Sequence, residues 1–589
     1  MRSLSFEFDP ESTAASPVGS RFTALRAVAR DTRRDVGIFA SRVASGPLGQ
    51  RSLLEARVMS VGGVAAYHRL VSRLVPEGSG RRRAFLPGVV GAVASCLILL
   101  GASQSTSPYA FKKLPYAWFF GDPSSTPGPP SFIGVFAVLG GMVLLVFAWF
   151  WLLQVRLRAK DSSLRHLGVI FAGWVLPMLV VAPILSRDVY TYAAQGEMMS
   201  HHISPYAYGP GVMGSGISFT NLTDPIWQQS PSPYGPLFLR LDGWIVSASG
   251  HSVLWSVVLL RLLALLGVLL ATVGVAMIAR HFQRDPVLAV LLVAFNPLVL
   301  LHLVGGAHND ALMVGLLVLG IALAVEKHPI LGTVMCALAA SVKAPAALAI
   351  VFIGWTWLDG RVDARPRRLF GVAVTGTIGL GIMAAFSELT GLGWGWTKGL
   401  SNPGVARTWL DAPTGLGMLL GRLFALVGLH GMTTDSITLV RDLGMLAAGL
   451  IILYLLVHCD RVGLVRAIGL SLLAVAILGP VVQPWYLTWG LIVLAPIASS
   501  RTLAAIVSGS AFASFVGVPI GAVVVGELQG FDPWLRIGTI LVVALIVVGL
   551  IRACRTLGVR SFPVGEIAKE KVRNRTGERQ AIQPQTARL

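Results

Sequence analysis

The chain has 589 residues, of which 54% are hydrophobic and only 13% are charged, and its formal net charge is +20. A soluble globular protein carries about 25% charged residues, so this composition excludes that class and indicates a helical protein with many membrane spans. The positive charge does not indicate a nucleic-acid partner, because the basic residues concentrate in the two tails and in short loops, beside anionic membrane lipid.

The N-terminal region, residues 1–83, contains fourteen arginines and no lysine. Gly, Ser and Pro are mixed among them, so we expect a partly disordered cytoplasmic region in which Val58–Val75 forms a short amphipathic helix on the membrane surface. Residues 84–551 are predicted to form one transmembrane unit, and residues 552–589 a basic cytoplasmic tail.

Apolar runs long enough to cross a bilayer recur through this transmembrane unit, so the predicted fold is an all-α polytopic membrane protein with about fourteen spans. The predicted spans are 85–104, 131–154, 167–185, 253–279, 286–304, 311–325, 329–342, 345–358, 369–390, 437–457, 466–482, 485–499, 502–526 and 534–551.

The distribution of arginine predicts the orientation of the spans, since cytoplasmic loops are enriched in Lys and Arg. If the stretch Thr414–His430 does not span, both termini face the cytoplasm. The loops that contain Arg156, Arg280, Arg361 and Arg461 then face the cytoplasm as well. We therefore interpret that stretch as re-entrant or as lying on the outer surface. The outer face then collects four segments: 186–252, 305–310, 391–436 and 482–485.

The first of these outer segments opens with Ser186-Arg-Asp-Val-Tyr-Thr-Tyr192, directly after an apolar run. Asp188 could cap a helix or pair with Arg187. It could also act as a general base, which needs a carboxylate held beside a hydroxyl in a partly dry site. The polar and aromatic residues around and after it suit a sugar's faces and hydroxyls: Tyr190, Tyr192, Glu197 and His201.

Two further groups of polar residues interrupt apolar sequence. His308-Asn-Asp310 opens a predicted span, and a helix cap explains one of these residues but not all three. Lys343 lies within an apolar stretch, where an ionisable group indicates a function unless its side chain reaches the interface. The candidates for binding a phosphate are Lys343, Arg261 and Arg407, and His308 with Asp310 could bind a divalent cation.

Aromatic residues beside prolines form the last group of candidates. Gln483-Pro-Trp-Tyr486 follows a span that ends at a proline. Trp485 and Tyr486 could stack on a sugar, line a groove for a polyprenyl chain, or anchor the protein at the membrane interface. The same alternatives apply to Tyr234 in Ser-Pro-Tyr-Gly-Pro.

At these residues the chain resembles the GT-C superfamily of integral-membrane glycosyltransferases. More closely, it is similar to the actinobacterial α-1,6-mannosyltransferases of lipomannan and lipoarabinomannan synthesis, over roughly residues 85–550. The length of its arginine-rich N-terminal region favours the member that begins the mannan backbone. Four motifs carry the resemblance: Ser-Arg-Asp188-Val-Tyr-Thr-Tyr-Ala-Ala-Gln-Gly, Pro-Tyr234-Gly-Pro-Leu, His308-Asn-Asp310-Ala-Leu and Gln483-Pro-Trp-Tyr-Leu.

The resemblance implies an inverting enzyme in the plasma membrane, with its active site on the outer face. Its donor would be polyprenyl-phosphate mannose, and its acceptor a mannosylated phosphatidylinositol or growing lipomannan. Asp188 would take the proton from the acceptor's 6-hydroxyl. The residues expected to bind the departing phosphate or to form the donor pocket are Lys343, Arg407, Arg261, His308, Asn309 and Asp310. Substrate contacts are expected from Arg187, Tyr190, Tyr192, Glu197, His201, Tyr234, Gln483, Trp485 and Tyr486.

Two alternatives remain from the sequence. The chain could transfer mannose or arabinose to a different lipid-linked acceptor, because the motifs do not separate these reactions. It could also be a transporter or lipid flippase that uses the same polar residues as an ion path. That function predicts charges near the bilayer midplane, whereas these residues cluster at one face. No cofactor is required by the proposed chemistry, and a divalent cation is the one candidate.

Overall fold

The computed structural model describes residues 80–104, 118–120, 132–158, 164–358, 364–399 and 411–516. The chain divides into two units, Met1–Gly78 and Ser79–Leu589, and every described residue lies in the second. Several predictions therefore fall outside the described residues: the N-terminal region up to residue 79 with its helix at Val58–Val75, the end of the span 502–526, the span at 534–551, the basic tail 552–589 and the phosphate candidate Arg407.

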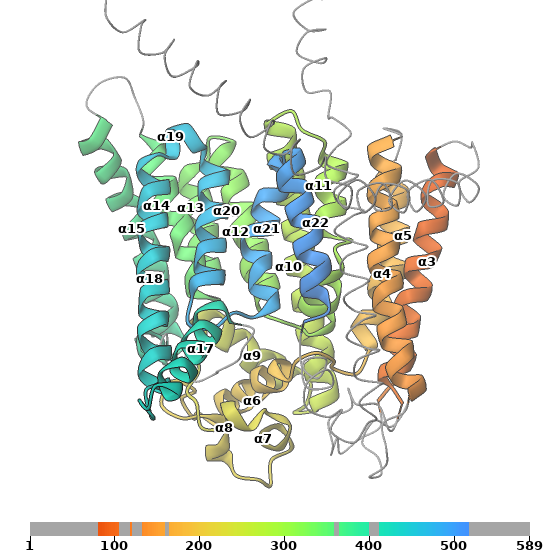
Figure 1. The fold of residues 1–589 in the computed structure, drawn as a ribbon, viewed down its shortest axis with the longest axis horizontal. Coiled ribbons are helices and arrows are strands. Elements are labelled where there is room, and N and C mark those ends of the chain that lie inside the picture. Colours follow the sequence, from red (N-terminus) through yellow and green to blue (C-terminus); the bar gives the residue numbers. More distant parts are fainter. Residues whose placement is uncertain are drawn as a thin grey trace, which may run out of the picture. The chain divides into compact units, whose positions relative to one another are not determined.

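The described residues form helices and contain no strand, which confirms the predicted all-α class (Figure 1). A first group packs together: α3 (Gly80–Ala102), α4 (Phe132–Arg158) and α5 (Leu164–Val180). The long helix α10 (Val253–His281) packs against α11 (Pro286–Val293) and α12 (Asp310–Val325). The remaining long elements are α13 (Pro329–Ala340), α14 (Ala347–Trp357), α15 (Ala364–Leu389), α18 (Thr433–Val457), α20 (Leu464–Leu478), α21 (Leu487–Leu494) and α22 (Ser500–Ser514).

Five described helices are long and apolar enough to cross a membrane: Ala84–Ala102, Phe136–Leu157, Val253–His281, Pro366–Leu389 and Thr433–Val457. Together with a bent pair that could form one more span, they identify a polytopic membrane protein. On α15 and α18 apolar side chains point outward, with Leu380 62% and Leu450 59% exposed, as expected of surfaces that face lipid. The predicted total of fourteen spans stays a prediction.

The predicted span 286–304 is broken into shorter pieces, and two further breaks lie where one predicted span ends and the next begins. The predicted span 286–304 divides into α11 and the π-helical turn η2 (Val299–Gly305), and η2 meets α12 at an angle of 112°. The 3₁₀ turns η3 (Ala344–Ala346) and η5 (Pro484–Tyr486) interrupt the chain before α14 and α21. Pro345 and Pro484 lack the backbone N–H that a continuous helix needs. Such irregular backbone is tolerated at membrane depth where it is buried in protein or lines a cavity.

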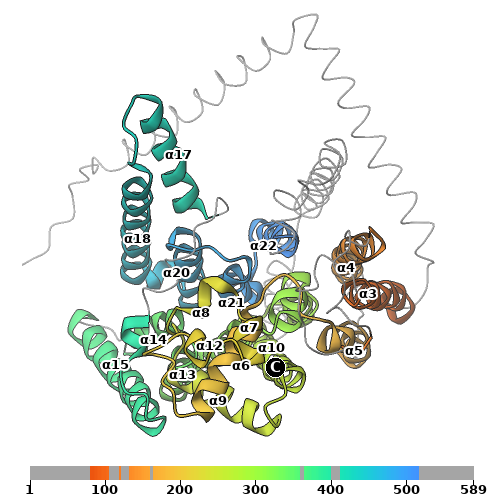
Figure 2. The same ribbon diagram turned by 90° about the horizontal axis from the view of Figure 1, so that it is seen from below.

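A layer of short helices lies at one end of the bundle, at the bottom of Figure 1 and facing the viewer in Figure 2. We call it the α6–α9 layer: α6 (Asp188–Ser200), η1 (Pro210–Met213), α7 (Ser218–Leu222), α8 (Pro225–Gln228) and α9 (Pro236–Ala248). The remaining short elements are α16 (Trp396–Gly399), α19 (Cys459–Val462) and η6 (Ala495–Ile497). Since the α6–α9 layer comprises most of residues 186–252, it corresponds to the predicted long loop.

Most of the stretch Thr414–His430 lies in α17 (Ala412–Leu426), which packs against α18. A helix of 15 residues rises by about 22 Å, which is less than the roughly 30 Å of a bilayer's hydrocarbon core. The interpretation of the stretch as re-entrant or surface-lying stays a prediction.

Two glycines allow the α6–α9 layer to pack closely. A Cβ at Gly196 would clash with the carbonyl group of Asp242, so α6 and α9 meet backbone to backbone. A Cβ at Gly235 would overlap the Ser341 carbonyl group, and the Gly235 N–H donates to the Val342 carbonyl at 3.0 Å. The second contact fixes the start of α9 beside the break that carries Lys343.

We predict that Gly196→Ala destabilises the protein, because the added methyl group must push α9 away from α6. Overpacking of this kind costs about 1–3 kcal/mol. The measurement is thermal unfolding in one detergent, with Gly216→Ala as the control, since a Cβ at Gly216 meets no atom within 4 Å. Equal transition midpoints for the two variants would contradict the close packing described here.

Candidate active site

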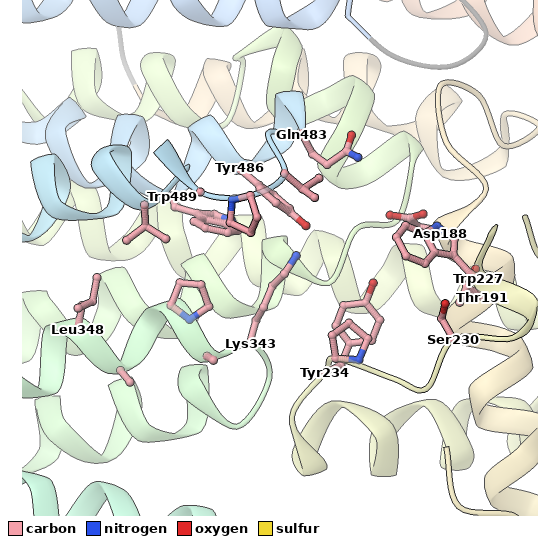
Figure 3. A pocket seen from close by; sticks show the side chains of 18 of the residues that line it. Asp188, Thr191, Trp227, Ser230, Tyr234, Lys343, Leu348, Gln483, Tyr486 and Trp489 are labelled. Carbon is pink, nitrogen blue, oxygen red and sulfur yellow. The ribbon is translucent and has the colours of Figure 1, made fainter. Parts of the chain in front are cut away.

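A cavity of about 500 Å³ lies between the α6–α9 layer and two of the helix breaks, and its size is typical of a small-molecule site. Figure 3 shows its labelled residues spread from Leu348 at one end to Trp227 at the other, with Lys343 between them. Its polar and aromatic lining consists of Asp188, Thr191, Gln195, Trp227, Ser230, Tyr234, Lys343, Gln483, Tyr486 and Trp489.

The two ends of the cavity differ in chemistry. Leu348 of α14 lies at the end away from Asp188 (Figure 3), and Val351 follows it by one helical turn; Met445 of α18 and Val475 of α20 add apolar lining. The other end is lined from α6 and from the segment that joins α8 to α9, where hydroxyl, amide and carboxylate groups occur. The cavity can therefore take a ligand with an apolar tail and a polar head.

Asp188 is the carboxylate at the polar end. It begins α6, where the positive end of the helix dipole favours a negative charge, and its backbone N–H donates to the Ser186 Oγ at 3.1 Å. Its side chain is 19% exposed. Burial raises the pKa of Asp188 to about 6; the Lys343 charge opposes this rise and the Asp310 charge adds to it. At neutral pH most molecules therefore carry Asp188 ionised, with more basicity than an ordinary aspartate.

His308 supports Asp188 from behind. Its Nδ1 lies 3.6 Å from the Asp188 Oδ2 and 3.3 Å from the Tyr192 hydroxyl oxygen. The imidazole is fully buried and stacks on the Trp485 ring, with ring centres 3.7 Å apart. Because Trp485 and Tyr192 hold the ring on two sides, His308 is placed to fix the orientation of the Asp188 carboxylate.

Lys343 reaches the cavity from the break between α13 and η3. Its Nζ donates to both oxygens of Asp310, each at 2.9 Å, and Trp489 Nε1 donates to the Asp310 Oδ1 at 2.6 Å. The ammonium also lies over the Tyr486 ring, 4.4 Å from its centre. The pair with Asp310 is nearly neutral overall, so Lys343 acts on a ligand through directed N–H bonds and its close charge more than through a net field.

The structure also places four predicted residues of this region. Tyr234 lines the cavity, and its ring packs edge-to-face on Tyr192 and Phe238. Gln483 and Tyr486 line the cavity too, and Tyr486 stacks on Trp489. Trp485 lies behind His308 and does not line the cavity. Predicted residues that line the cavity are thus Asp188, Tyr234, Lys343, Gln483 and Tyr486.

Arg261 lies elsewhere, although it was predicted to bind phosphate. Its fully buried guanidinium donates to the Gly305 carbonyl at 3.0 and 2.7 Å and to the Leu179 carbonyl at 3.2 Å. Arg261 therefore braces the end of η2, just before His308, and does not line the cavity.

Other predicted residues also lie outside the cavity lining. Glu197 accepts from His201 Nε2 at 3.0 Å and from His251 Nδ1 at 2.7 Å, which ties α6 to the start of α10. Asn309 is buried behind the cavity lining. The last two predicted contacts, Arg187 and Tyr190, likewise lie outside the lining.

Sequence reasoning missed five polar or aromatic lining residues: Thr191, Gln195, Trp227, Ser230 and Trp489. Thr191 and Gln195 follow Asp188 by three and seven positions, so helical periodicity would have placed them on its face. Trp489 follows Tyr486 by three positions in the same way. For Trp227 and Ser230 no spacing signal exists, because short irregular elements connect them to α6.

The described residues contain no group of three or more His, Cys, Asp or Glu side chains arranged to hold a metal ion. Asp310, one member of the predicted cation pair, is bound to Lys343 and Trp489.

Comparison with known proteins shows which family this chain matches. Residues 88–359 match the profile of the family described as "Alpha-(1->6)-mannopyranosyltransferase, N-terminal domain", and residues 413–553 match the "MptB C-terminal domain". No solved structure matches the chain.

Individual relatives carry the same description. The chain is 32% identical to alpha-(1->6)-mannopyranosyltransferase A of Mycobacterium tuberculosis, over 63% of this chain and 72% of the relative. It is 33% identical to a probable alpha-(1->6)-mannopyranosyltransferase of Mycolicibacterium smegmatis, over 60% and 69%. It is 28% identical to alpha-(1->6)-mannopyranosyltransferase B of Corynebacterium glutamicum, over 68% and 73%.

We predict that Asp310→Asn destabilises the protein by about 3–5 kcal/mol, because it leaves the Lys343 ammonium buried without its counter-charge. The double variant Asp310→Asn with Lys343→Met should recover most of that loss, since it removes the unpaired charge. Chemical unfolding in detergent measures both.

The control is Glu326→Gln, which breaks the partly exposed contact between Glu326 and His281 and should cost less than about 1 kcal/mol. A double variant no more stable than the single one would show that charge pairing is not what Asp310 supplies.

Proposed function

The chain belongs to the α-(1→6)-mannopyranosyltransferase family, and from this premise we propose that it transfers mannose from polyprenyl-phosphate mannose to the 6-hydroxyl of a mannosylated phosphatidylinositol or lipomannan. As a membrane mannosyltransferase it needs a site for a sugar, a base and a leaving group. One observation supports the proposed donor and acceptor: a single cavity joins apolar lining to the Asp188 carboxylate and the Lys343 ammonium.

The apolar end of the cavity supports a polyprenyl donor. A polyprenyl chain is a run of methyl-branched hydrocarbon units, and burying it among Leu348, Val351 and Met445 removes apolar surface from water. The donor's phosphate then reaches Lys343, whose bonds to Asp310 use two of its three N–H donors. The mannose lies beyond the phosphate, toward Asp188.

The proposed reaction is a single displacement. Asp188 takes the proton of the acceptor's 6-hydroxyl while that oxygen forms a bond to C1 of the donor mannose. The bond between C1 and the phosphate oxygen breaks, and its electron pair leaves with polyprenyl phosphate. A β-linked donor thus gives an α-linked product. The Lys343 ammonium stabilises the charge that develops on the leaving oxygen.

The surroundings of Asp188 suit the role of base. A general base works best when its pKa lies near the working pH, and burial brings the pKa of Asp188 to about 6. His308 lies against the carboxylate and limits its rotation. Glu197 is held by two histidines away from the cavity, so the proposed mechanism has no second carboxylate as a nucleophile.

We place this site at the outer face of the plasma membrane, with both termini in the cytoplasm. The basic residues Arg156 and Arg280 lie at the ends of α4 and α10 that are opposite to the α6–α9 layer, and Arg461 in α19 follows the far end of α18 (Figure 1). Arginine marks cytoplasmic ends, which supports an outward-facing layer.

We predict that Asp188→Asn lowers mannose transfer by about 10²–10⁴-fold, since a positioned base contributes that much. The measurement uses protein in nanodiscs with radiolabelled polyprenyl-phosphate mannose and a short α-1,6-dimannoside acceptor. Asp435→Asn, which removes an exposed carboxylate on α18, is the control. Full activity of Asp188→Asn would remove Asp188 as the base, and no transfer by the parent protein would reject the donor or acceptor.

We also predict a pH dependence of kcat/KM. Asp188 must be deprotonated to accept a proton, so the rate should be level above about pH 7 and fall about tenfold per unit as the pH drops below its pKa of about 6. An ordinary aspartate would shift this fall below pH 4. A rate that is constant from pH 5 to pH 8 would exclude a base with this pKa.

A further inference from the structure

Trp227 is an aromatic residue at the polar end of the cavity that the reaction described above does not use. It lies in α8, is half-buried, and lines the cavity. Its side chain makes no ring contact, hydrogen bond or ion pair with another described residue. The other cavity aromatics are packed, Tyr234 on Tyr192 and Tyr486 on Trp489. Trp227 therefore offers a large apolar ring face to a ligand.

The backbone around Trp227 is held firmly although α8 has only four residues. The Asp224 carboxylate accepts from the Ile226 N–H at 3.1 Å. Gln228 Nε2 donates to the carbonyls of Thr220 and Thr223, at 3.0 and 3.2 Å. These bonds tie both ends of α8 to the neighbouring chain, so the backbone that carries the ring is fixed before a ligand arrives, and little entropy is lost on binding.

Groups that bond hydroxyls surround the ring. Thr191 and Gln195 reach the cavity from α6, and Ser230 from the segment after α8. The Thr191 hydroxyl is buried and has no partner among the described residues. Gln195 Oε1 accepts a hydrogen bond from the Ser232 hydroxyl at 3.1 Å. This bond orients the amide and leaves its N–H donors for other partners. An apolar face beside several hydroxyl partners is the combination that a pyranose ring requires, because its C–H face is apolar and its edge is polar.

The order of groups along the cavity identifies the sugar. In Figure 3 Asp188 lies in one group with Trp227, Thr191 and Ser230, and Lys343 lies between this group and Leu348. In the proposed reaction the donor phosphate lies at Lys343, so the donor mannose lies on the near side of Asp188. A sugar on Trp227 would lie within the group that includes Asp188, where the base can reach its hydroxyl.

We propose that Trp227, with Thr191, Gln195 and Ser230, forms the acceptor subsite: the terminal mannose of the acceptor stacks on the indole, which presents its 6-hydroxyl to Asp188. This inference rests on the proposed function for the identity of the sugar. The ring selects a saccharide acceptor over water, which would otherwise hydrolyse the donor.

The first test compares Trp227→Ala and Trp227→Phe with Trp244→Ala, which removes an exposed tryptophan on α9 outside the cavity. Transfer is measured while the concentration of dimannoside acceptor is varied, and again while that of the donor is varied. Trp227→Ala should raise the KM for the acceptor about tenfold and leave the KM for the donor within about twofold. Trp227→Phe should recover most of the loss, and Trp244→Ala should match the parent.

The second test needs no turnover. Binding of an α-1,6-dimannoside, without donor, is followed by saturation-transfer NMR on the parent and the same variants. Weaker binding by Trp227→Ala, but not by Trp244→Ala, supports the subsite even if the parent transfers no mannose. If the parent transfers mannose and Trp227→Ala leaves both the dimannoside binding and the acceptor KM unchanged, the subsite is overturned and the proposed function stays intact. A parent that neither binds the dimannoside nor transfers mannose would overturn both.

Discussion

The buried carboxylate of Asp310 is the group around which the site is built. A carboxylate inside an apolar bundle costs several kcal/mol unless it is paired and hydrogen-bonded. Asp310 opens α12, and its oxygens accept from Lys343, which lies in the break before η3, and from Trp489 in α21. The Asp310 carboxylate therefore links three separate interruptions of the helical bundle to one another.

The breaks themselves give the protein its cavity. A straight helix satisfies every backbone group internally and presents only side chains, whereas an interrupted one brings backbone and short polar loops to membrane depth. Here the interruptions meet the α6–α9 layer, whose glycines at 196 and 235 permit close approach. Asp188 lies at this junction, dry enough for a raised pKa, while Leu348 and Val351 extend the cavity into apolar surroundings.

The fold class and much of the lining of the candidate site could be predicted from residues alone. Long apolar runs indicated a polytopic helical protein, and the motifs around Asp188, Asp310, Lys343 and Tyr486 were recognised because polar groups in apolar sequence are costly. Apolar runs do not show where a helix breaks. Thus the predicted span 286–304 is two pieces, and Lys343 lies in a break whose neighbours come from elsewhere.

By itself the sequence determined hydropathy, helical faces and the identity of the unusual residues, all of which depend on near neighbours in the chain. Tertiary structure decided which of those residues meet. Lys343 and Trp489 bind Asp310 across 33 and 179 positions, while Arg261, a phosphate candidate by residue type, is used to bind the Gly305 carbonyl. Trp227 gave no signal, because its role depends on which wall of the cavity the short helix α8 reaches. Such pairings depend on the packing of helices in three dimensions, which local periodicity does not encode.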